Sequence, residues 1–82
     1  MLPPFSKNAT ELKLGIYQHY SGKQYEVLGI GRHSETLEEM VVYKALYAPF
    51  DIWIRPLGMF LEQVTINGIL QPRFALVEIA VK

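Results

Sequence analysis

The 82-residue sequence contains no cysteine, so neither a disulfide framework nor a thiolate metal site can form. The lack of cysteine fits a reducing compartment, and we expect a cytoplasmic protein. No apolar run approaches the ~20 residues that cross a bilayer. Residues 1–7 also lack the basic stretch and following apolar segment of a signal peptide. The sequence therefore predicts no membrane association.

A charge excess is missing as well. Eight basic residues balance eight acidic residues. A protein that binds nucleic acid through its phosphates usually carries a basic excess, so nucleic acid is an alternative partner rather than the favoured one. Zero net charge leaves little repulsion between copies, and we expect a monomer or a weak homodimer.

What the sequence does contain is a series of short segments rich in Val, Ile, Tyr, Phe and Trp. Gly, Pro, Asn and Ser separate these segments, a pattern typical of β-strands joined by turns. Two runs, 24–32 and 41–47, flank a polar bend from Arg32 to Glu38 and predict a long hairpin. Further strands are predicted over residues 15–20, 52–55, 62–66, 69–71 and 74–81.

The turn residues complete this prediction. Asn67-Gly68 lies between two β segments, and because both residues tolerate positive φ, it predicts a tight hairpin turn. Gly29 and Gly31 predict a bend or bulge within the second strand. Residues 57–61 are too few for a stable helix and predict a single helical turn. We therefore expect a mainly β fold, a small SH3-like antiparallel β-barrel or roll with one short helical turn.

This β-roll is predicted to be one domain over residues 15–82, preceded by an N-terminal arm over residues 1–14. Within the arm, Asn8 and Glu11 have the spacing of a capping box, which would allow one further helical turn. Six apolar residues in or beside the predicted strands are expected to form the core: Leu28, Ile30, Val42, Leu46, Ile54 and Phe60.

Several short motifs in a fixed order resemble those of one protein family. They are Gly15-x-Tyr17-x-His19-Tyr20, Tyr25-Glu26-Val27, Arg32-His33-Ser34-Glu35-Thr36, Val42-Tyr43-x-x-Leu46-Tyr47, Trp53-x-Arg55-Pro56, Met59-Phe60 and Pro72-Arg73-Phe74. The resemblance is to the small bacterial family called domain of unknown function 1653. It implies a compact SH3-type β-roll in a bacterial protein. It implies no activity, and no site residue follows from it.

The bend itself is the densest polar cluster in the chain, and it consists of Arg32, His33, Ser34, Glu35 and Thr36. A Ser-His-acid mechanism needs the hydroxyl and the imidazole within hydrogen-bond reach, but neighbours in an extended strand point to opposite faces. Ser, Thr and Glu also stabilise bends through bonds to nearby backbone. A structural loop, a binding site and a catalytic site are the three interpretations, and we predict no catalytic residue.

Aromatic residues supply the other candidate site. A barrel this small cannot bury every large ring, and tyrosine keeps a polar end that favours water or a partner. We expect a functional surface where the bend meets the first strand and the Trp53 segment. Beside the bend residues it would contain Tyr17, His19, Tyr43, Trp53 and Arg55.

The most favoured function is a non-enzymatic binding module for a peptide or a small polar ligand. A nucleic-acid-associated accessory domain is the first alternative, in which rings stack on bases. A small enzyme that uses the Arg32–Thr36 cluster is the second. The two histidines lack metal-ligand spacing, and the sequence indicates no metal and no cofactor.

Overall fold

The structure is a computed structural model, and it describes residues 2–80. Within these residues, seven strands and two short helices follow one another. Their bounds are α1 (Lys7–Glu11), β1 (Gly15–His19), β2 (Gln24–Arg32), β3 (Glu39–Ala45), β4 (Ile52–Pro56), α2 (Leu57–Phe60), β5 (Gln63–Ile66), β6 (Ile69–Pro72) and β7 (Phe74–Ile79). The prediction of a mainly β chain of short strands is confirmed.

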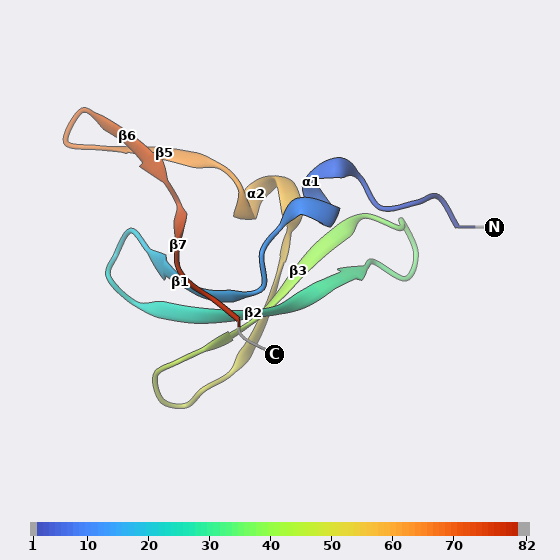
Figure 1. The fold of residues 1–82 in the computed structure, drawn as a ribbon, viewed down its shortest axis with the longest axis horizontal. Coiled ribbons are helices and arrows are strands. Elements are labelled where there is room, and N and C mark those ends of the chain that lie inside the picture. Colours follow the sequence, from blue (N-terminus) through green and yellow to red (C-terminus); the bar gives the residue numbers. More distant parts are fainter. Residues whose placement is uncertain (1, 81–82) are drawn as a thin grey trace.

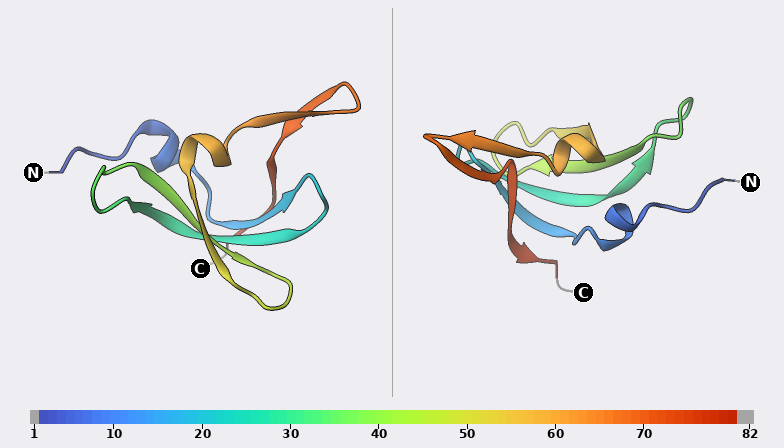
Figure 2. Two further views of the ribbon diagram at one scale, coloured as in Figure 1. Left: turned by 180° about the vertical axis from the view of Figure 1, so that it is seen from behind. Right: turned by 90° about the horizontal axis from the view of Figure 1, so that it is seen from above.

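The strands form two antiparallel sheets (Figure 1). Five strands lie in the order β4-β3-β2-β1-β7, so β7 returns to pair with β1. The hairpin β5–β6 forms a sheet of its own and projects from the rest of the fold in all views (Figures 1 and 2). The five-stranded sheet curves around α2 as an open roll, in keeping with the predicted antiparallel architecture.

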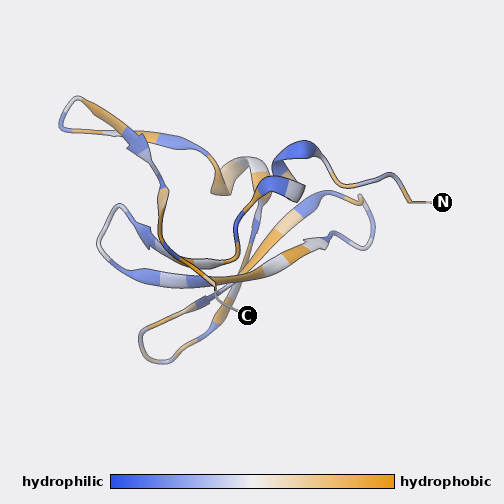
Figure 3. Cartoon of the chain, viewed as in Figure 1, coloured by the Kyte–Doolittle hydropathy of each residue, from blue (hydrophilic) through white to orange (hydrophobic). Residues whose placement is uncertain are grey.

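The core lies on the inner face of the five-stranded sheet, where α2 covers it. Phe60 from α2 is 1% exposed and stacks on Phe74 of β7 with ring centroids 4.3 Å apart. Tyr17 and Tyr43 direct their rings at Phe60 from 5.5 and 5.6 Å. Offset and edge-on aromatic pairs stabilise a core beyond the area they bury. Figure 3 shows apolar segments in the strands of the sheet. In the core these segments are joined by aromatic rings from four separate elements.

The predicted core was correct for Phe60 but wrong for three of the other residues. Leu28, Leu46 and Ile54 are 43%, 38% and 62% exposed. The register of β2 against β3 shifts between Val27 and Gly29, so Leu28 lies in a bulge. This bulge confirms the expected irregularity near the glycines. Ile30 and Val42 are half-buried, and Ile30 packs against the core cluster.

Exposure of Ile54 follows from the alternation of side chains along β4. Trp53 pairs with Tyr43 and Arg55 pairs with Val41, both of which are buried on the inner face. Successive side chains of a strand point to opposite faces, so Ile54 belongs to the outer face. Trp53 and Arg55, which are more polar than Ile54, therefore point inward.

The N-terminal segment packs against the end of the β2–β3 hairpin. Its helical turn, α1, begins after Ser6 and not after Asn8 as expected. The Ser6 hydroxyl accepts a bond from the Ala9 amide, and its own N–H and O–H each donate to Glu39 over 2.6 Å. Arg32 donates to the carbonyl of Pro3 over 2.7 Å. These bonds, together with the burial of Ala9, fix α1 against the sheet.

Positive φ values favour glycine at Gly15, Gly22 and Gly68. Asn67 and Gly68 have φ of 52° and 78° between β5 and β6, which confirms the predicted turn. Gly15 has φ of 145°, and a side chain there would overlap the backbone of β7 at Glu78. The pairing of β1 with β7 therefore depends on a bare backbone at Gly15. Within residues 2–80, no helix is long and apolar enough to cross a membrane.

Candidate functional site

An open hollow of about 250 Å³ lies on the inner face of the sheet, beside the aromatic core. We call it the aromatic hollow. It combines five aromatic side chains with an imidazole and a guanidinium, and its lining residues are His19, Tyr25, Tyr43, Tyr47, Trp53, Arg55 and Phe74. Four of these seven, His19, Tyr43, Trp53 and Arg55, are among the predicted site residues.

Strand register explains how these side chains meet. Trp53 of β4 lies opposite Tyr43 of β3, and Arg55 follows two residues later on the same face. At the other side of the sheet, His19 of β1 lies opposite Phe74 of β7. Directly paired residues share a face of the sheet, so each of these pairs lies on one face. The sheet is curved, and its two edge strands, β4 and β7, therefore both contribute side chains to the hollow.

The floor and the rim of the hollow differ in exposure. Tyr43 and Phe74 are 4% and 7% exposed and form the floor, whereas Trp53 stands at the rim with half of its surface exposed. The hydroxyls of Tyr25 and Tyr47 share a hydrogen bond of 2.6 Å, which joins two of the walls. Burial, followed by this bond to Tyr47, raises the pKa of Tyr25 to about 12. The Tyr25 wall therefore remains an uncharged phenol at neutral pH.

Arg55 supplies the charge within the hollow. Its Nε donates to the hydroxyl of Tyr43 over 3.3 Å, and its guanidinium carbon lies 5.6 Å from the centroid of the Phe74 ring. Among residues 2–80 the one ion pair between side chains joins Arg73 to Glu62, and no carboxylate pairs with Arg55. Lys23 does not line the hollow, but its ammonium lies 4.5 Å from the centroid of the Tyr47 ring.

His19 contributes a neutral imidazole. Burial lowers its pKa, and the nearby charges of Arg55 and Arg73 lower that pKa further. Its Nδ1 accepts a bond from the Ser21 amide over 3.1 Å and lies 2.9 Å from the Ser21 hydroxyl. Since Nδ1 is an acceptor there, the proton of the neutral ring is on Nε2. These bonds hold the His19 ring against the turn that follows β1.

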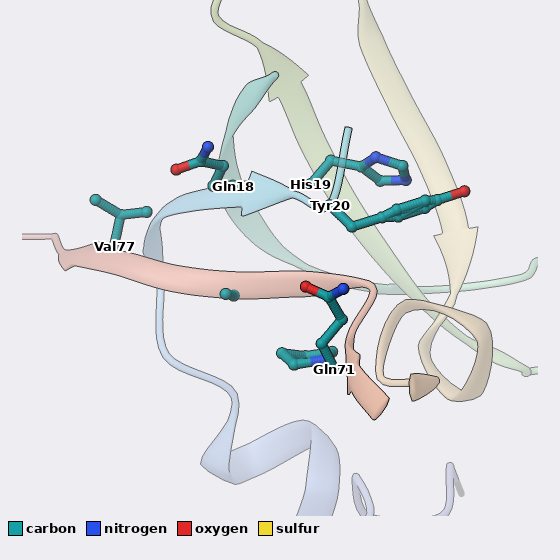
Figure 4. A pocket seen from close by; sticks show the side chains of 7 residues that line it. Gln18, His19, Tyr20, Gln71 and Val77 are labelled. Atoms are coloured by element: carbon teal, nitrogen blue, oxygen red, sulfur yellow. The ribbon is translucent and has the colours of Figure 1, made fainter. Parts of the chain in front are cut away.

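A second hollow of about 220 Å³ lies next to the first, between β1 and the end of β6 (Figure 4). It shares His19 with the aromatic hollow. Figure 4 shows the rings of His19 and Tyr20 side by side at the end of β1, with centroids 4.2 Å apart, and Gln71 nearby on β6. Beside these two rings its walls are side-chain amides and small apolar groups, without the charge that marks the aromatic hollow.

The polar cluster at the bend lies at the opposite end of β3 from the β3–β4 loop that leads to Trp53 (Figure 1). There, the Nδ1 atom of His33 accepts bonds from the amides of Glu35 and Thr36 over 3.1 and 3.3 Å. Arg32 is engaged with the N-terminal segment, and Ser34 is exposed. The structure therefore does not join the bend residues to the aromatic residues in one surface.

Tyr17 also lies outside the aromatic hollow. It is 6% exposed, and its hydroxyl donates to the carbonyl of Lys13 over 2.7 Å. Burial raises its pKa, although the bond to Lys13 acts in the opposite direction. Tyr17 is thus a core residue that anchors the segment between α1 and β1.

Three lining residues, Tyr25, Tyr47 and Phe74, were not among the predicted site residues. Tyr25 could have been found from the sequence, because it lies two residues before Val27 in the same strand and therefore shares its face. In the structure Val27 is buried on the inner face, and Tyr25 pairs there with Ala45. Phe74 gave no such signal. It reaches the hollow only because β7 crosses back to β1, a pairing between distant parts of the chain.

These features define a small antiparallel β protein with an aromatic hollow on the inner face of its sheet. The chain belongs to the family described as Protein of unknown function (DUF1653), whose model matches residues 15–76. The fold is similar to the crystal structure of a DUF1653 protein from Bordetella bronchiseptica, with a TM-score of 0.80. The two are 37% identical, over 90% of this chain and 97% of that chain. No curated protein matches the chain.

Proposed function

We propose that this protein is a non-enzymatic binding module and that its ligand, a small polar molecule or a single peptide side chain, enters the aromatic hollow. The observation that carries the proposal is the set of five aromatic side chains and one guanidinium around a single open space. Rigid rings with a few fixed polar groups are the usual composition of a recognition site.

The size of the hollow limits what it can hold. Its volume of about 250 Å³ is below the roughly 300–1,000 Å³ of sites for drug-sized ligands. One ring with a short polar substituent fits such a space, and a longer peptide would place one residue there. The ligand is therefore a small group and not an extended chain.

The polar groups in the hollow favour binding over catalysis. Tyr25 and Tyr47 bond to each other, and the Nε of Arg55 bonds to Tyr43. His19 is the basic group of the hollow, and its Nδ1 is engaged by Ser21 in the adjacent turn. Nucleophilic catalysis needs a base that is oriented by a third group toward a nucleophile in the site. Among residues 2–80, no acid bonds to His19 to complete such a set.

The chain contains one tryptophan, and Trp53 stands at the rim of the hollow, so its indole N–H is a single reporter of occupancy. We would titrate ¹⁵N-labelled protein with a library of small ring compounds and follow this resonance. The proposal predicts saturable shifts for at least one ring compound. Tyr47→Ala removes a wall and should weaken that compound about 2- to 10-fold, the value of one aromatic contact.

Tyr20→Ala is the matched control. Tyr20 is an exposed tyrosine that lines only the second hollow, so its loss should leave the affinity unchanged. If no ring compound shifts the Trp53 resonance saturably, the proposed function is wrong. If Tyr20→Ala weakens binding and Tyr47→Ala does not, the second hollow is the binding site instead.

A further inference from the structure

The aromatic hollow contains a positive charge, and this charge bears on which ligands can bind there. Sites walled by several aromatic rings commonly bind quaternary ammonium groups through the negative ring faces. Here the protein places its own cation among the rings, because the Arg55 guanidinium lies 5.6 Å from the centroid of Phe74. A second cation, Lys23, lies 4.5 Å from the centroid of Tyr47. A cationic ligand would meet the like charge of Arg55 within the hollow, and Lys23 adds a second positive charge beside the Tyr47 wall.

The hydrogen-bonding capacity of Arg55 adds direction to this charge. A guanidinium has five N–H donors, and the bond to Tyr43 uses only Nε. No carboxylate of residues 2–80 pairs with Arg55, unlike Arg73, which bonds to Glu62 over 3.0 Å. The terminal nitrogens of a guanidinium match the two oxygens of a carboxylate or a phosphate.

The orientation of Arg55 is fixed before any ligand arrives. The bond to Tyr43 and the contact with the Phe74 ring hold the side chain, and both partners are buried residues of the core. A donor group that is already ordered loses little conformational freedom on binding. The neighbouring imidazole of His19 is neutral, so Arg55 provides the positive charge among the lining residues. Arg55 is thus a preformed receptor for an anion.

We propose, on the basis of the function proposed above, that the ligand is a small anion that carries a planar ring. Its carboxylate or phosphate oxygens bind the Arg55 guanidinium, and its ring lies against the aromatic walls near Trp53. The charge selects the ligand class, and the rings add affinity that inorganic anions lack.

Isosteric ring compounds that differ in charge test this inference on the unmodified protein. Phenylacetate is the carboxylate probe, 2-phenylacetamide is its neutral counterpart, and 2-phenylethylammonium is the cation. Phenyl phosphate distinguishes the two anion chemistries, and acetate and inorganic phosphate lack the ring. The Trp53 indole resonance reports binding of each probe.

We expect at least one ring anion to bind about 10-fold or more tightly than the amide, because hydrogen bonds between charged groups contribute more free energy than those to a neutral group. The ammonium probe should bind most weakly, and the anions without a ring more weakly than their ring counterparts. Higher salt should weaken the anionic probes and leave the amide unchanged. Equal or tighter binding of the amide or the ammonium would overturn the inference while the proposed function stands. If none of the ring probes binds, this inference is wrong, and the titration with the library of ring compounds decides the proposed function separately.

Two matched variants assign the effect to Arg55. Arg55→Gln should weaken the ring anion about 10-fold or more and leave 2-phenylacetamide unchanged. Lys44→Gln removes the same charge from the outer face, where Lys44 pairs with Ile52 and Glu26, and should change neither affinity. Equal losses in both variants would indicate a long-range effect of net charge and would contradict the assignment. If Arg55→Gln does not fold, the charge series on the unmodified protein decides the question.

Discussion

Replacing Phe60 by Ala is the sharpest test of how the fold is held together. Phe60 is 1% exposed, stacks on Phe74 and meets Tyr17 and Tyr43 with its edges or face. Truncation of a buried Phe costs about 3–5 kcal/mol through lost transfer energy and the cavity that remains. The whole free energy of unfolding of an 82-residue domain is roughly 4–12 kcal/mol. The variant is therefore expected near the limit of stable folding.

Thermal and urea unfolding, followed by circular dichroism, measure this loss. In a domain of this size each kcal/mol corresponds to about 4–8 °C in Tm, so Phe60→Ala should lower Tm by at least ~12 °C. Met59 precedes Phe60 in α2 but is 49% exposed, and Met59→Ala is the matched control with little expected change. Equal shifts for the two variants would refute the aromatic stack as the centre of the core.

Two further predictions concern the ends of the sheet. Gly15→Ala should lower Tm and expose the amides of β7 to hydrogen exchange, because the new methyl group overlaps the backbone at Glu78. Gly29→Ala, where the methyl group meets nothing within 4 Å, should do neither, and equal behaviour of both would contradict this reasoning. Ser6→Ala should raise the pKa of the Glu39 carboxyl toward its ordinary value, since bonds from Ser6 are the main cause of its lowered pKa. That lowered pKa means the contact is present at neutral pH and is lost as pH falls through it. An unchanged Glu39 titration by carboxyl ¹³C NMR would show that the Ser6 hydroxyl does not hold this carboxylate.

Local sequence signals were sufficient for the order and type of the elements. Asn67-Gly68 predicts its turn because the preference for positive φ belongs to the two residues themselves. Pro56 ends β4, as expected of a residue without an N–H donor, and one helical turn follows it. The helix cap was placed wrongly, since Ser6 and Asn8 are both good caps and the bonds from Ser6 to the distant Glu39 decide between them.

The side-chain directions could not be obtained in the same way. Ile54 was predicted to lie in the core, whereas pairing with β3 turns its neighbours Trp53 and Arg55 inward. Leu28 left the core because a bulge, whose exact position is set by the partner strand, moved it out of register. The same limit applies to the site, because Trp53 was predicted beside the bend and lies instead with Phe74, a residue brought near by long-range pairing.

The return of β7 to β1 also determines when the aromatic hollow exists during synthesis. Strands β1 to β4 pair as successive hairpins and can assemble as the chain leaves the ribosome, with one edge of β1 still open. The floor of the hollow remains incomplete until Phe74 emerges and stacks on Phe60. A molecule that binds in the hollow can therefore bind only chains whose synthesis has passed β7. By mass action it stabilises the completed sheet and not the partly synthesised one.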